Sequence, residues 1–183
     1  YRLGGLAPNA GHHVHMPSHI YLRTGEWEEA VKSNDLAVEA DRNYQLKSGS
    51  KGLYMLMYYN HNIHMLASSH AANGNYAGSI KAANDLATSA GPNVKAAPML
   101  EMFMPYPIIS NIQFHKWDEM LAYPKPAEHM LTTIAHWHFG RGMAFAEKKK
   151  TADAEKELVA MREIGAKIPA TATLFTTPVS VAL

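Results

Sequence analysis

Apolar positions between Gly11 and Asp41 are spaced as on two helices that flank a break at residues 23–26. The second helix carries a stripe at intervals of three and four residues, typical of a buried face. The stripe consists of Trp27, Ala30, Val31, Asn34, Ala37 and Val38. Gly25 lies in the break, where a helix C-terminus needs a residue that tolerates positive φ. The pattern predicts a helical hairpin in which Trp27 is buried and the small residues Ala30 and Ala37 face inward.

The hairpin pattern returns three times along the chain. Gly74 follows Gly25 by 49 residues and again separates two apolar stripes. Weaker copies turn at His115 and at Lys149, which stand where the glycine stood. We therefore expect three to four helical hairpins, with His115 as a turn residue.

The sequence Gly-x-aromatic-x-x-small recurs at residues 25–30 and 74–79. This recurrence resembles the tetratricopeptide repeat, a helix–turn–helix unit with a period of about 34 residues. The resemblance covers residues 11–168, although two of the three spacings are longer than the family's period. It implies an all-α fold of stacked antiparallel hairpins in a TPR-like right-handed α-solenoid, with residues 1–168 as the repeat domain. The stretch at 15–21 also resembles uncharacterised bacterial repeat proteins of this class.

The resemblance also implies a function. Repeat arrays of this kind present a concave groove to a protein or peptide ligand, or assemble with themselves. A protein-interaction or self-assembly scaffold is therefore the expected role. Side chains available to clamp a peptide in such a groove are Asn60, Asn62 and Arg141. An exposed ring of tyrosines is expected beside the groove, formed by Tyr54, Tyr58 and Tyr59.

Histidines occupy matching places in two of the hairpins. His12 and His15 precede Gly25 by thirteen and ten residues, and His61 and His64 precede Gly74 by the same intervals. Residues three and four apart share one helix face, so His19 joins the first pair. A partial third copy places His136 thirteen residues before Lys149. Because the first helix of each hairpin lines the groove in the family that the chain resembles, the imidazoles should converge there.

Converging imidazoles support a second hypothesis, a metal-binding protein or metalloenzyme. The candidate ligands are His12, His15, His19, His61, His64 and His136. Imidazole ligation alone suits Zn, Cu, Ni or Fe and does not distinguish among them. The same histidines would also suit a polar groove in which they donate hydrogen bonds to a peptide or an anion, and that alternative stays open.

Composition and missing motifs exclude several classes of protein. The chain has no cysteine, which rules out disulfides, thiolate metal sites and covalent haem c. No phosphate-binding glycine loop or Gly-x-Ser-x-Gly motif is present, so we expect no nucleotide and assign no catalytic residue. A formal net charge of +1, without a basic stripe, gives no reason to expect nucleic acid. No apolar run approaches the roughly 20 residues of a membrane span.

The C-terminal tail, residues 169–183, lacks a helical stripe and is rich in Thr and Val, which suit extended structure. We expect it to cap the last hairpin or to form a homo-oligomeric contact, which in a repeat array can propagate into a filament. The chain begins at Tyr1, so it is either a processed export product or part of a longer protein. A periplasmic or extracellular location is favoured over a cytoplasmic one.

Overall fold

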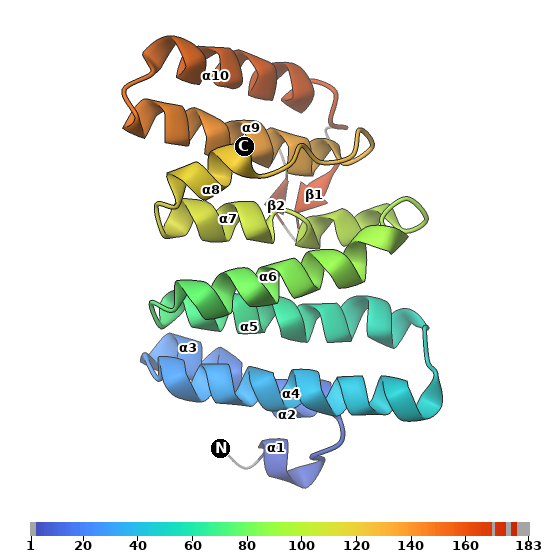
Figure 1. Ribbon diagram of the computed structural model, residues 1–183. Helices are drawn as coiled ribbons and strands as arrows, with labels where there is room; N and C mark the ends of the chain where they lie inside the picture. The colour runs from blue at the N-terminus through green and yellow to red at the C-terminus, as the bar shows by residue number, and fades with distance from the viewer. Residues whose placement is uncertain (1–2, 170, 175–176, 179–183) are drawn as a thin grey trace. The chain divides into compact units, whose positions relative to one another are not determined.

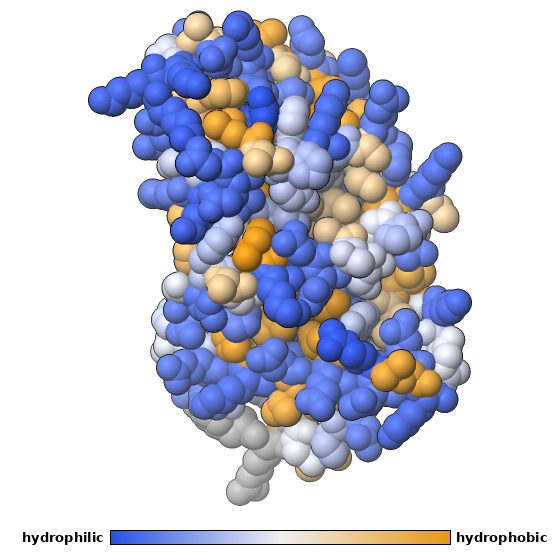
Figure 2. Space-filling model, viewed as in Figure 1, coloured by the Kyte–Doolittle hydropathy of each residue, from blue (hydrophilic) through white to orange (hydrophobic). Residues whose placement is uncertain are grey.

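The computed structural model describes residues 3–169, 171–174 and 177–178 (Figure 1). Contacts within the chain divide it into two compact units, Tyr1–Ala90 and Gly91–Leu183. The regular elements of the described residues are helices apart from one short pair of strands, which confirms the all-α class. No helix among the described residues is long and apolar enough to cross a membrane. Hydrophilic residues cover most of the face in Figure 2, with hydrophobic residues scattered between them.

The first unit consists of helices that pack around one long helix. Its elements are α1 (Leu3–Leu6), α2 (Gly11–His15), α3 (Ser18–Thr24), α4 (Trp27–Ser48), the π-helical turn η1 (Met55–Tyr59), α5 (Asn60–Ala72) and α6 (Tyr76–Ala90). The long helix α4 contacts α2, α3 and α5, and α5 contacts α6. Ala30 and Ala37 are fully buried, as predicted, and lie in the core with Ile63, Ala67 and Leu86. Their small side chains let α4 approach its neighbours closely.

The second unit repeats the hairpin architecture. Its elements are η2 (Gly91–Asn93), η3 (Pro98–Phe103), α7 (Tyr106–Gln113), α8 (Trp117–Ala122), α9 (Leu131–Glu147), α10 (Thr151–Gly165), β1 (Thr173–Leu174) and β2 (Thr177–Pro178). Ile108, Met120 and Ala144 form a buried cluster at the contact of α7, α8 and α9. The two strands pair antiparallel. The tail's predicted oligomeric contact falls largely on residues 170, 175–176 and 179–183, which lie outside the described residues.

The same turn joins the helices of four hairpins, α3–α4, α5–α6, α7–α8 and α9–α10. The turn residue is left-handed each time, with φ of 83° at Gly25, 71° at Gly74, 54° at His115 and 59° at Lys149. The next helix begins two residues later in every case. The expected turn positions are therefore confirmed. His115 and Lys149 adopt a backbone conformation that glycine adopts at lower cost.

Two details of the first hairpin differ from expectation. The prediction that Trp27 is buried is wrong, because its side chain is 37% exposed. Trp27 is the first residue of α4, and its indole lies beside the turn at Gly25 instead of between the helices. The first helix of this hairpin is also interrupted, since α2 ends at His15 and α3 begins at Ser18. Pro17 lies in the gap and cannot donate the backbone hydrogen bond of a continuous helix.

Candidate metal centre

Five histidines of the first unit gather where α2, α3 and α5 meet, and we call them the histidine cluster. They are His12 and His15 of α2, His19 of α3, and His61 and His64 of α5. Met16 and Pro17 keep right-handed helical dihedral angles across the break, so His15 and His19 retain the spacing of one helical turn. The π-helical turn η1 leads directly into α5. It places Tyr58 edge-on against His12, with ring centroids 4.7 Å apart.

His15 lies at the centre of the cluster. Its Nε2 atom is 3.0 Å from Nε2 of His19 and 3.1 Å from Nε2 of His61. Ring nitrogens of His12, His15 and His61 all lie within 4.8 Å of one another, close enough to hold a metal ion. For comparison, nitrogens bound tetrahedrally at about 2.0–2.1 Å from a zinc ion lie roughly 3.3 Å apart. The observed separations around His15 are close to that value.

Burial disfavours the charged form of four of the five rings, those of His15, His19, His61 and His64. Burial is the main cause that lowers the pKa of His15 and of His61 to about 4, and that of His64 to about 3. It also lowers the pKa of His19. Repulsion from neighbouring positive charges lowers these pKa values further, whereas the hydrogen bond that His15 donates to Asn34 raises that of His15. Imidazole must be neutral to bind a metal, so these rings are in the competent form at neutral pH.

Asn34 of α4 forms a hydrogen bond with the imidazole of His15. Its Oδ1 atom lies 2.7 Å from Nδ1 of His15. Its amide nitrogen donates to the Ala30 carbonyl at 2.9 Å and to Ser69 Oγ at 3.0 Å. A hydrogen bond at the second ring nitrogen of this kind orients metal-binding histidines in many proteins.

A buried carboxylate fixes the start of α2. Asp41 is 1% exposed and accepts hydrogen bonds from the Tyr54 hydroxyl at 2.8 Å and from Asn62 Nδ2 at 2.7 Å. The backbone N–H of His12 donates to the same Tyr54 hydroxyl at 3.3 Å. Any side chain at Gly11 would collide with the Asp41 carboxylate. Burial raises the pKa of Asp41, and the hydrogen bonds from Tyr54, Asn62 and the backbone N–H of Gly11 oppose that shift.

The cluster borders solvent. His19 is exposed, and His12 and His61 are partly exposed. Nδ1 of His12 is buried and meets no hydrogen-bond partner among the described residues. A buried nitrogen without a protein partner is a feature that a bound ion would explain.

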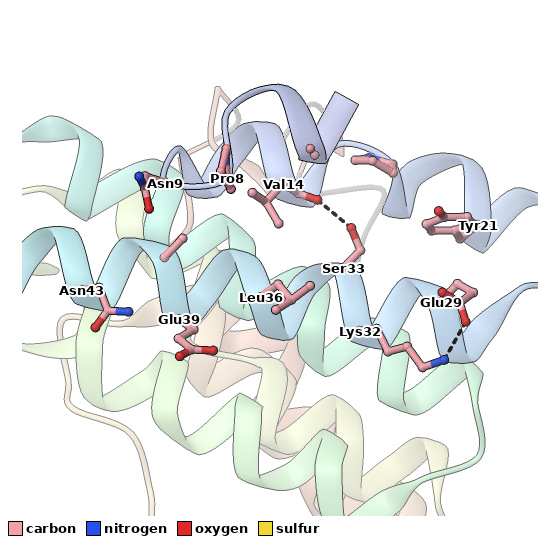
Figure 3. Close-up of a pocket in the computed structure, with 14 residues that line it drawn as sticks. Pro8, Asn9, Val14, Tyr21, Glu29, Lys32, Ser33, Leu36, Glu39 and Asn43 are labelled. Atoms are coloured by element: carbon pink, nitrogen blue, oxygen red, sulfur yellow. Dashed lines mark hydrogen bonds and ion pairs between the residues drawn. The ribbon is translucent and has the colours of Figure 1, made fainter. Parts of the chain in front are cut away.

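A pocket in the first unit is a separate feature. It measures about 540 Å³ and lies between α1, α2 and α4 (Figure 3). Val14 and Leu36 contribute apolar surface, and Ser33 in its wall donates a hydrogen bond to the Val14 carbonyl at 2.7 Å. Its 14 lining residues include no histidine. The pocket therefore offers no ligand to the histidine cluster.

The structure places the remaining predicted residues as follows. His136 belongs to the second unit, where it is buried in α9 and its Nδ1 donates to the Thr132 carbonyl at 2.8 Å. Tyr59 is buried, so the expected exposed tyrosine ring is wrong at that position. Asn60 and Asn62 are buried as well and do not present the amides expected to clamp a peptide. Arg141 is bound to Glu157 and to the Leu121 carbonyl.

Sequence reasoning missed Asn34 and Asp41 as parts of the site. The sequence pattern places Asn34 only on the buried stripe of the second helix and Asp41 only at the end of the hairpin. The available signal was a polar side chain at a buried stripe position, because buried polar groups are almost always hydrogen-bonded to something specific.

Comparisons with models of known protein families, with curated proteins and with solved structures found no match.

Proposed function

We propose that this chain binds a transition-metal ion through the histidine cluster. His12, His15 and His61 supply the ligand nitrogens, and His19 lies close enough to His15 to add a fourth. The observation that carries the proposal is the convergence of two other Nε2 atoms on Nε2 of His15, at 3.0 and 3.1 Å.

In the alternative, the cluster is held only by hydrogen bonds. Hydrogen bonds alone cannot pair all of these ring nitrogens at the same time. A neutral imidazole has one proton and one lone pair. Nε2 of His15 can therefore form a hydrogen bond with only one of its two neighbours at a time. A cation placed among the rings accepts a lone pair from each of them, and His12 can add a ring nitrogen that lies within 4.8 Å of those of His15 and His61. A metal ion thus accounts for the close approach of these ring nitrogens.

Imidazole ligands favour a metal ion that is intermediate between hard and soft. Neutral imidazoles suit Zn, Cu, Ni or Fe, whereas Mg and Ca prefer oxygen ligands. The proposed ligands carry no negative charge, so a bound divalent ion keeps its full charge. Such an ion would supply Lewis-acid chemistry, or redox chemistry if it is copper or iron.

The proposal predicts the metal content of the purified chain. After removal of metal with a chelator, equilibrium dialysis against Zn, Cu or Ni in the presence of free imidazole should leave about one ion per chain. Free imidazole competes for weak sites on surface histidines, whereas a site that supplies several nitrogens at once retains its ion. Metal content is measured by elemental analysis. A chain that retains no ion under these conditions contradicts the proposal.

A protein-interaction scaffold built from TPR-like hairpins is the second candidate. The shared left-handed turn in four hairpins favours it. In that role the hairpins would stack into a solenoid whose groove takes a protein or peptide, or a second copy of the chain. The two functions differ in one simple respect, because a scaffold keeps its partner binding when a chelator removes all metal. Loss of partner binding on chelation would show that binding of the partner depends on the bound metal.

A further inference from the structure

The orientation of the Asn34 amide follows from its two acceptors. One amide atom lies 2.9 Å from the Ala30 carbonyl oxygen, which can only accept a hydrogen bond. That atom must therefore be the nitrogen, Nδ2. The Ser69 hydroxyl supports the assignment, because Ser69 donates its own proton to the Met65 carbonyl at 2.7 Å and accepts from Asn34. The oxygen Oδ1 consequently faces His15.

The amide in turn determines which nitrogen of His15 carries the proton. Oδ1 of Asn34 lies 2.7 Å from Nδ1 of His15 and can only accept. Ser18 Oγ also donates to this oxygen, at 3.4 Å. Nδ1 of His15 must therefore carry the hydrogen. A neutral ring has no second proton, so the lone pair is on Nε2, the atom that points at His19 and His61.

We propose that Asn34 is a positioning residue that selects the Nδ1–H tautomer of His15 and thereby presents Nε2 to the metal. This inference rests on the proposed metal centre. Asn34 is fully buried in α4, which contacts both α2 and α5, so it is held on a rigid element. Free histidine in water favours the opposite tautomer only slightly, and one strong hydrogen bond is enough to reverse that preference.

The test compares tautomer and metal affinity in Asn34→Ala and in a matched control, Ser33→Ala. Ser33 precedes Asn34 on α4 and also bonds α2, through the Val14 carbonyl, but it does not contact the cluster. Nitrogen-15 NMR of the metal-free wild-type chain should show His15 protonated at Nδ1. Asn34→Ala should give a mixture of tautomers and weaken zinc binding about 10–100-fold. Ser33→Ala should change neither readout.

The two readouts separate the failure of this inference from the failure of the metal centre. An Nε2–H tautomer in a wild-type chain that binds zinc would overturn the role of Asn34 alone. Unchanged zinc affinity in Asn34→Ala would do the same. A wild-type chain with the Nδ1–H tautomer that binds no zinc would overturn the metal centre. The spectrum of the wild-type chain tests the tautomer even if Asn34→Ala fails to fold.

Discussion

Replacing His15 by alanine is expected to weaken metal binding by more than about 100-fold. Loss of an outer partner of a ligand typically costs 10–100-fold in affinity, and loss of the ligand itself costs more. His15 is the central ligand, because its Nε2 lies within 3.1 Å of two other imidazole nitrogens. The affinity is measured by competition with a chromophoric chelator.

His13→Ala is the matched control for this experiment. His13 is in the same helix, but it is exposed and is not one of the five residues of the histidine cluster. Its removal should leave the affinity unchanged. His61→Ala should resemble His15→Ala, because His61 supplies a candidate ligand nitrogen from a second helix, α5. Equal affinity in the His15 and His13 variants would place the bound ion elsewhere on the chain.

The metal-free chain is expected to lose stability as the pH falls from about 6.5 toward 4. The pKa of His15 is about 4 in the folded chain and 6.5 without the fold. The folded state therefore binds fewer protons in this window, so acidification favours unfolding. The stability linked to His15 is complete above pH 6.5 and is lost as the pH falls through the folded value. The loss from His15 alone is about 3 kcal/mol.

Other groups around the cluster modify this pH profile. The pKa values of His61 and His64 are lowered in the same direction and add to the loss. His12, His19 and Arg23 contribute repulsion whenever they are charged. Asp41 acts oppositely, because its raised pKa gives stability at low pH that is lost as the pH rises through the folded value. It therefore offsets part of the loss only at the acidic end.

Urea unfolding of the chelated chain at several pH values measures this effect. His13→Asn should follow the wild-type profile, since that histidine is exposed. A free energy of unfolding that stays constant between pH 7 and pH 5 would show that the cluster is not buried as described.

Most of the local structure of this chain could be predicted from its sequence. The positions of Gly25 and Gly74 locate two turns directly, because few other residues tolerate the backbone there. The stripe on α4 likewise predicts that Ala30 and Ala37 are buried. The prediction fails at Trp27 because periodicity indicates which side of a helix is buried and not where along the helix the burial begins. Trp27 is the first residue of α4 and lies beside the turn at Gly25.

The site could be predicted only in part. Helical spacing predicts that His12, His15 and His19 share a face, and the matching intervals before Gly25 and Gly74 place His61 near them. Asn34 reaches His15 across the hairpin, and Asp41 reaches Tyr54 across a loop, so neither contact has a signature in local spacing. Such contacts depend on the approach of whole helices. The polar members of a buried stripe are the best sequence-level indication of where they occur.

X-ray absorption at the metal edge of the loaded chain tests the central claim most directly. It reports the type, number and distance of the atoms bound to the ion. For the zinc-loaded wild-type chain, we predict three or four nitrogen ligands at about 2.0–2.1 Å with the multiple-scattering pattern of imidazole. A shell made mainly of water or carboxylate oxygens, with one imidazole or none, would contradict a metal centre at His12, His15 and His61.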